Sequence, residues 1–168
     1  TDFLEIDTEE IEEVVEETLE PLSREGGENP AKVVSELREM MQNKAGIIRT
    51  GGLLEEALVE LEEFRIRAAS TSPGGGRMYN PGWHQALEIE AMVDVSKMCA
   101  ISALRREESR GAHTRDDFPD TDHGHWGKVN SVIVMGDDGS MNIDFVSYPE
   151  IPEELKSLLD SDDLHEEE

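Results

Sequence analysis

The sequence predicts a mainly α-helical fold: a bundle of three to four helices with up-and-down, spectrin-repeat-like topology, followed by a small β-hairpin tail. Three observations lead to this prediction. Four segments repeat apolar residues at steps of three and four, which is the spacing of one face of a helix. Only 5% of the residues are aromatic, so the core has to be built from aliphatic side chains, as helical bundles often are. Two short alternating runs near the C-terminus surround a glycine- and aspartate-rich turn, which is typical of a hairpin.

The first helix is expected to begin near Asp7, whose carboxylate can cap it, with Glu10 completing a capping-box pattern. Its apolar stripe consists of Ile11, Val14, Val15, Thr18, Leu19 and Leu22. Glutamates surround this stripe, so the helix should pack on one side only. Gly26 and Gly27 are expected to end it.

Two further helices begin at recognisable capping residues. Asn29 followed by Pro30 predicts the start of the second helix, and Thr50 predicts the start of the third. The stripe of the second helix consists of Val33, Val34, Leu37, Met40, Met41 and Ala45. The stripe of the third helix consists of Leu54, Ala57, Leu58, Leu61, Phe64 or Arg65, and Ala68. Residues 47–48 between the two are expected to form a short extended connector.

The fourth helix is expected to start at Asn80 and to run to about Arg110. Apolar residues occupy nearly every side of it between Trp83 and Leu104, and a helix that is apolar all round is buried all round. We therefore expect it at the centre of the bundle, with Cys99 as a small core residue. The residues expected at its middle are Met92, Val93, Val95, Met98, Cys99, Ala100 and Ile101. The serine- and glycine-rich residues 70–76 before it should form the most flexible internal loop.

The domain boundaries follow from these patterns. We expect the helical bundle over residues 1–119 and an irregular loop with the hairpin over residues 120–152. The hairpin strands are predicted at residues 129–135 and 141–148, with a four-residue loop. A short helix and a disordered acidic tail are expected over residues 153–168. Because residue 1 is threonine rather than methionine, one interpretation is that the chain is part of a longer protein.

The charge excludes several kinds of partner. With 40 acidic and 15 basic residues the formal net charge is −25, which should repel nucleic acids and anionic lipid, so we expect no nucleic-acid partner. Acid-rich, lysine-poor surfaces resemble those of proteins from salt-loving organisms, and a specific cationic partner is the competing explanation. The sequence shows neither a membrane-spanning apolar run nor a signal peptide, so no direct membrane insertion is expected. A single cysteine agrees with a reducing, cytoplasmic compartment.

Patterns for chemistry are weak. His113, His123 and His125 have Asp120 and Asp122 nearby, but a His-x-His loop without cysteines is a weak metal pattern, so no metal site is expected. The glycines of residues 74–76 lack the spacing of a phosphate-binding loop, and no G-x-G-x-x-G follows a predicted strand. Ser109 lies in no nucleophile-elbow pattern.

The string ESRGAHTRDDFP at residues 108–119 resembles the hallmark near the end of succinate dehydrogenase and fumarate reductase flavoprotein subunits. The strings YNPGWH at residues 79–84 and ELREMMQ at residues 36–42 resemble the same family in the same order. Trp126 and the hairpin also fall where that family places its closing β-segment. The resemblance, which covers about residues 28–148, is to the C-terminal helical domain of that subunit.

The resemblance implies a parent enzyme that binds FAD, interconverts succinate and fumarate, and passes electrons to an iron–sulfur subunit. The segments that hold flavin and dicarboxylate in this family are not matched here, so we expect no catalytic, cofactor-binding or metal-binding residue and no activity of the chain alone. The implied partners are the FAD-binding domain of the same subunit and the iron–sulfur subunit. The implied location is cytoplasmic and peripheral to the membrane through the parent complex.

The hallmark string supplies an interface hypothesis. Its members are Glu108, Ser109, Arg110, Gly111, His113, Arg115 and Asp116. Arginine forks and aspartate acceptors suit docking through charged hydrogen bonds, and Arg110 and Arg115 would then be solvated in the isolated chain. Gly111 permits a left-handed exit from the helix. The alternative from the residues alone is a helix C-cap followed by an internally salt-bridged loop; the resemblance favours the interface.

Two other functions stay open at this point. L-aspartate oxidase carries a related helical domain and a similar Glu-Ser-Arg-Gly string, although the YNPGWH start and the hairpin favour the dehydrogenase. From a different class, the chain could be a free-standing acidic helical bundle that binds a basic partner.

Overall fold

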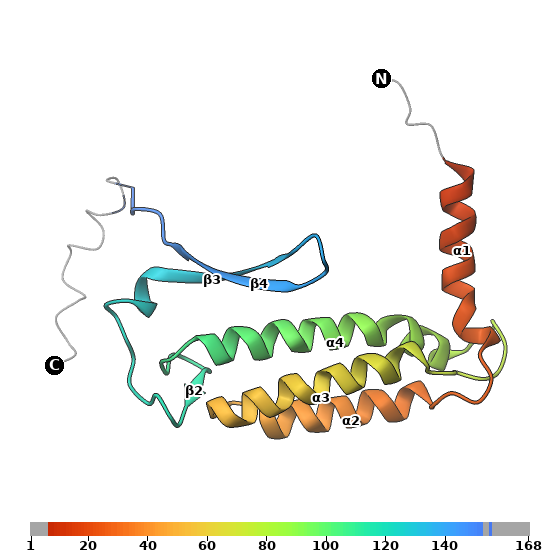
Figure 1. The fold of residues 1–168 in the computed structure, drawn as a ribbon, viewed down its shortest axis with the longest axis horizontal. Coiled ribbons are helices and arrows are strands. Elements are labelled where there is room, and N and C mark those ends of the chain that lie inside the picture. Colours follow the sequence, from red (N-terminus) through yellow and green to blue (C-terminus); the bar gives the residue numbers. More distant parts are fainter. Residues whose placement is uncertain (1–6, 153–154, 156–168) are drawn as a thin grey trace. The chain divides into compact units, whose positions relative to one another are not determined.

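The computed structural model describes residues 7–152 and residue 155 of the chain (Figure 1). Its helices are α1 (Thr8–Ser23), α2 (Pro30–Lys44), α3 (Gly51–Ala69) and α4 (Pro81–Arg105). Its strands are β1 (Ile48–Arg49), β2 (Thr114–Arg115), β3 (Val129–Met135) and β4 (Met141–Ser147), with a short 3-10 helix at Trp126–Lys128. The predicted mainly α fold with a C-terminal hairpin is confirmed. The chain divides into two compact units between Thr121 and Asp122.

The helix starts lie where the capping residues place them. In each case a side-chain oxygen accepts a hydrogen bond from a backbone N–H of the first turn, which would otherwise have no partner. These capping residues are Asp7, Asn29, Thr50 and Asn80. Proline occupies the first position of α2 and α4, where its missing N–H costs nothing.

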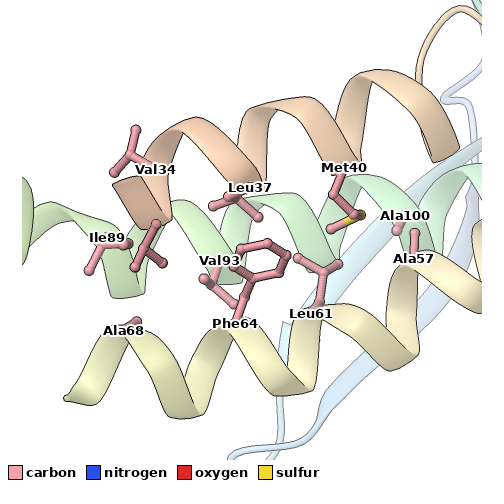
Figure 2. Packing of buried hydrophobic residues seen from close by; sticks show 11 residues of the cluster. Val34, Leu37, Met40, Ala57, Leu61, Phe64, Ala68, Ile89, Val93 and Ala100 are labelled. Atoms are coloured by element: carbon pink, nitrogen blue, oxygen red, sulfur yellow. The ribbon is translucent and has the colours of Figure 1, made fainter. Parts of the chain in front are cut away.

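The core lies between α2, α3 and α4, which run side by side with α3 antiparallel to the other two (Figures 1 and 2). It consists of Val33, Val34, Leu37, Met40, Ala57, Leu61, Phe64, Ala68, Ile89, Val93 and Ala100. Phe64 is 6% exposed, so Phe64 and not Arg65 completes the stripe of α3. Each fully buried Val, Leu, Ile, Phe or Met side chain contributes about 1.5–3 kcal/mol to the free energy of unfolding, so apolar burial is the main interaction that holds the three helices together.

The expectation that α4 is buried on all sides is wrong for the described chain. Val93 and Ala100 are buried, but Val95 is 58% exposed and Cys99 is also exposed, so Cys99 is not a core residue. Helices α2 and α3 cover about one side of α4, and α1 contacts α4 only near its start. The apolar residues on the outer side of α4 therefore remain uncovered.

Helix α1 is anchored only near its end. The indole nitrogen Nε1 of Trp83 donates to the carbonyl oxygen of Thr18 at 2.7 Å, and Pro21 is buried. Nearer its start, Ile11 and Val14 are 48% and 55% exposed, so that part of the apolar stripe lacks cover. The helix ends at Ser23, before the glycines that were expected to end it.

Gly27 has a different role from the predicted one. A Cβ atom at this position would lie 2.1 Å from the carbonyl oxygen of Ser70, so only glycine allows the α1–α2 linker to approach the end of α3. Ser72 fastens the same approach, because its N–H donates to the carbonyl of Glu28 at 2.9 Å.

The second unit is built on the antiparallel pair β3–β4. The Gly136 N–H donates to the Ser140 carbonyl at 2.8 Å, and Gly139 has φ +76°. The loop is therefore three residues long rather than four, with a left-handed glycine at its last position. Trp126 packs edge-on against Phe145, with ring centres 5.0 Å apart. Except for residue 155, the predicted final helix and tail lie outside the described residues.

Candidate functional site at the end of α4

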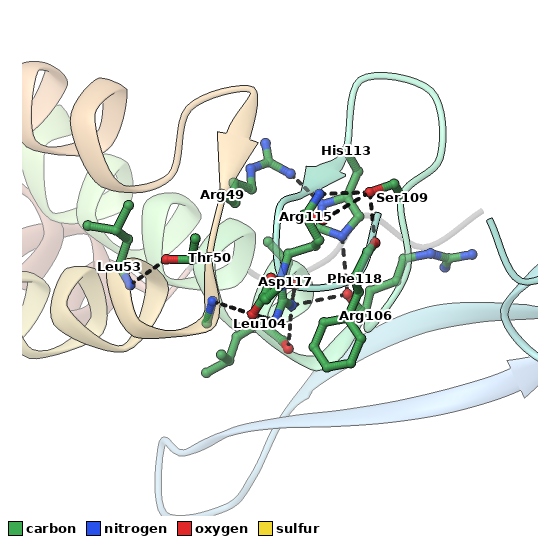
Figure 3. A network of polar contacts seen from close by, with 12 residues as sticks. Arg49, Thr50, Leu53, Leu104, Arg106, Ser109, His113, Arg115, Asp117 and Phe118 are labelled. Carbon is green, nitrogen blue, oxygen red and sulfur yellow. Dashed lines mark hydrogen bonds and ion pairs between the residues drawn. The ribbon is translucent and has the colours of Figure 1, made fainter. Parts of the chain in front are cut away.

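The candidate site lies where the loop of residues 106–121 folds back on the C-terminal end of α4 (Figure 3). The helix ends at Arg105, so the prediction that it runs to about Arg110 is wrong. Arg106 leaves the helix with φ −91° and ψ 102°. The last carbonyl groups of the helix then need other donors.

Arg115 supplies those donors. It is 2% exposed, and its Nη1 donates to the carbonyl oxygens of Ala103 (2.9 Å), Leu104 (3.0 Å) and Arg106 (3.2 Å). A positive charge at this end also suits the negative end of the helix dipole. Arg115 therefore caps α4 from within the domain, and the expectation that it is solvated in the isolated chain is wrong.

Asp117 connects this capped end to α3. Its Oδ1 and Oδ2 accept from Nε and Nη2 of Arg115 at 2.7 and 2.8 Å, and Oδ2 also accepts from the N–H of Gly51 at 2.8 Å. The hydrogen bonds from Arg115 first, and from Gly51, hold the pKa of the Asp117 carboxyl below its usual range. One ionised carboxylate thus ties the start of α3 to the end of α4.

Glu108 is fully buried and paired with two arginines. Its Oε1 accepts from Nε of Arg106 at 2.8 Å and from Nε of Arg110 at 3.0 Å, while Oε2 accepts from Nη2 of Arg110 at 3.2 Å. A buried carboxylate without such partners would cost several kcal/mol. Glu108 therefore needs both guanidinium groups to stay where it is.

Ser109 and Gly111 shape the loop itself. The hydroxyl of Ser109 accepts from the N–H of Arg115 at 2.9 Å and donates to the carbonyl of Phe118 at 2.9 Å. Gly111 has φ +59°, which confirms the left-handed conformation. It lies in the tight turn of residues 110–113 rather than directly at the helix end.

His113 joins the loop to β1. Its Nδ1 lies 2.6 Å from Nη1 of Arg49, which can only donate, so Nδ1 accepts and Nε2 donates to the carbonyl of Arg106 at 3.2 Å. Burial first, and then the nearby arginine charges, hold the pKa of His113 below its ordinary value. The neutral imidazole is therefore a bridge between two arginine residues, beside the parallel pair β1–β2.

The structure thus gathers most of the hypothesised residues into one network. Glu108 and Arg115 are buried and serve the fold of the domain. Arg110 and His113 are partly exposed, and Gly111 and Asp116 are exposed. Asp116 enters the network only through its backbone N–H, which donates to the carbonyl of Arg49 at 2.9 Å. The interface hypothesis stays a prediction for these four accessible residues.

Four members of the network were not in the hypothesised set: Arg49, Gly51, Arg106 and Asp117. Arg49 and Gly51 lie more than 60 residues before their partners, with separations of 64 and 66 residues. No local pattern connects residues so far apart. The one available signal was the connector before α3, which the sequence marked as extended.

No group of three or more histidine, cysteine, aspartate or glutamate side chains is arranged to hold a metal ion within residues 7–152 and 155. In the same part of the chain, the parallel strands β1 and β2 are two residues long and form no strand, glycine loop and helix of the kind that cradles a dinucleotide. The described residues therefore do not fit FAD. None of the described helices is long and apolar enough to span a bilayer.

Comparison with known proteins places these features in a family. The family described as fumarate reductase flavoprotein C-term matches residues 34–158. The fumarate reductase flavoprotein subunit of Helicobacter pylori (strain 26695) is 30% identical over 88% of this chain. The corresponding subunit of Mycobacterium tuberculosis is 32% identical over 73% of it. The chain spans 21% of the length of each of these relatives.

Solved structures agree. The structure of Mycobacterium smegmatis Sdh1 in complex with UQ1 matches 95% of this chain with a TM-score of 0.79 and 32% identity, and the match covers 27% of that chain. The apo form of the Sdh1 complex matches 88% of this chain with a TM-score of 0.76 and 36% identity. These matches favour the succinate dehydrogenase and fumarate reductase flavoproteins over the L-aspartate oxidase and free-standing-bundle alternatives. The chain belongs to the family of C-terminal domains of fumarate reductase and succinate dehydrogenase flavoproteins.

Proposed function

We propose that this chain works as the C-terminal domain of a flavoprotein subunit that interconverts succinate and fumarate. In this role it supports the FAD-binding domain and the assembly of the subunit with an iron–sulfur subunit. The chain contributes no catalytic residue, and alone it binds no FAD and oxidises no succinate. The complete protein reaches the membrane surface through its partner subunits.

The observation that carries this proposal is the division of the hallmark string into a buried half and an accessible half. Arg115 fixes the loop to the end of α4, Asp117 fixes it to the start of α3, and Glu108 holds it together internally, so the loop has a defined shape before any partner binds. Arg110, His113 and Asp116 are then held in place at its accessible side. A preorganised polar loop pays little ordering entropy on docking, which suits an assembly surface.

The test uses Asp116→Arg in the complete flavoprotein subunit, because Asp116 is exposed and its side chain caps no helix. In the isolated 168-residue chain this change should alter stability by no more than about 0.5 kcal/mol. In the complete subunit it should weaken association with the iron–sulfur subunit or the retention of FAD. Asp137→Arg in the β3–β4 loop is the matched control, since it makes the same charge change at another exposed position.

Equal behaviour of the two variants in assembly would contradict the role of the loop. If the protein encoded by the complete reading frame carries no flavin, that result would contradict the proposed function altogether.

A further inference from the structure

The outer side of α4 carries an apolar ridge that the other helices of the helical unit leave exposed. Its members are Leu87, Ala91, Val95 and Cys99. They recur at steps of four and so lie along one line of the helix, while the core residues Ile89 and Val93 lie on the other side (Figure 2). Leu87 is 39% exposed and Val95 is 58% exposed. A shallow depression of about 430 Å³ lies beside the ridge and is lined by Ala91, Met92, Val95 and Ser96, with Glu88 as its one charged residue.

This ridge differs from the outer sides of the neighbouring helices. One third of the chain is charged, and the solvent sides of α2 and α3 carry charged residues, among them Arg65, Glu60 and Glu36, that make ion pairs between helices. None of the four ridge positions is charged. A continuous apolar strip on an otherwise strongly charged surface is typical of an interface rather than of a face that water solvates.

Charge decides which partner fits. A second copy of this chain would bring another net charge of −25 against the first, and anionic lipid would be repelled in the same way. The relatives indicate a different candidate. This chain spans only 21% of their length, so in such a subunit the rest of the polypeptide is covalently attached to this domain and is present at high effective concentration.

Resting on the proposed function, we propose that the α4 ridge is the surface that docks onto an apolar patch of the flavin-binding region of the same subunit. The accessible loop at the end of α4 then faces assembly partners, while the side of the same helix holds the domain in place. Apolar burial supplies the association, and the absence of ridge charges avoids desolvating an ion.

The single cysteine gives a direct test, because its thiol sits on the ridge and is exposed. Alkylation of Cys99 by iodoacetamide is followed by mass spectrometry of its peptide, in the isolated 168-residue chain and in the complete flavoprotein subunit. We expect Cys99 to react at least about tenfold more slowly in the complete subunit than in the isolated chain. Val95→Glu should restore fast alkylation there, measured against the isolated chain with the same substitution.

Val59→Glu on α3 is the control, because Val59 is 67% exposed and lies outside the ridge. It should leave the protection of Cys99 unchanged. Equal alkylation rates in the isolated chain and in a flavin-containing subunit would overturn the ridge proposal and leave the proposed function standing. Slow alkylation already in the isolated chain would also overturn it, because the chain would then cover its own ridge. A complete subunit without flavin would overturn both proposals.

Discussion

The two ends of the helical unit are built in opposite ways. At the end of α4, five hydrogen bonds from the Arg115 side chain join the helix end to the loop, and Asp117 extends this network to the Gly51 N–H at the start of α3. At the start of α1, the glutamates form four like-charge pairs at steps of four residues, and the apolar stripe is half exposed. The helix of each region begins at a clear capping residue, Asp7 in α1 and Asn80 in α4. The difference shows that such signals specify the helix but not what holds it in place.

The sharpest test of this comparison is Arg115→Ala. The change would leave the helix carbonyls of Ala103 and Leu104 without this donor and Asp117 without its guanidinium partner, so we expect a loss of about 3–5 kcal/mol in the free energy of unfolding. Urea unfolding followed by circular dichroism measures it. Arg77→Ala, which removes the same charge from an exposed position, should cost no more than about 0.5 kcal/mol. Similar losses for the two variants would mean that the network contributes little to stability.

A pH titration tests the same end of the helical unit, with a smaller expected effect. Because the pKa of His113 is held below its ordinary value of 6.5, the unfolded chain binds the proton more readily than the folded chain. Stability should therefore be fully present above about pH 6.5 and fall as the pH drops toward the folded pKa. The melting temperature between about pH 7 and pH 6 records the effect, above the range where most carboxylates titrate.

His113→Gln provides the comparison, because glutamine can accept from Arg49 and donate to the Arg106 carbonyl without titrating. Its melting temperature should vary less with pH over this range. Superimposable pH profiles for the two proteins would show that His113 does not carry the dependence.

The smallest effect is expected at α1, where Glu13→Lys replaces two like-charge pairs, with Glu9 and Glu17, by opposite-charge pairs. Each such pair is worth about 0.2–0.5 kcal/mol, so the helix should gain roughly 1 kcal/mol in dilute buffer. Molar KCl should raise the helicity of the original chain more than that of the variant, because salt screens the repulsion. Hydrogen exchange of the α1 amides measures both. If the hydrogen-exchange rates of the α1 amides do not change with salt concentration, that result would argue against the interpretation of the acidic surface as suited to high salt.

Local chemistry explains which parts of the fold could be predicted. The helix starts at Asn29, Thr50 and Asn80 depend on neighbours a few residues away, and so does the turn around Gly139. The end of α4 was misplaced because it depends on Arg115, which lies ten residues beyond the helix.

The candidate site could be predicted only in part for the same reason. The string of residues 108–119 marked the correct segment, and its salt-bridged alternative describes Glu108 and Arg115 better than the interface does. The burial of α4 was overestimated because composition says how apolar a helix is, but not how many neighbours the bundle provides.

The bond between Arg49 and His113 has a consequence for the order of folding. Making it closes a loop of more than 60 residues, whereas the helix caps join residues within one turn. Closing so long a loop has an entropic cost that local contacts do not offset. The caps and helices should therefore form early, and the Arg49–His113 hydrogen bond should form late. Substitutions at the bridge should accordingly hasten unfolding and leave the refolding rate almost unchanged. The loop that presents the accessible residues is then the last part of the helical unit to take shape and the first to come apart.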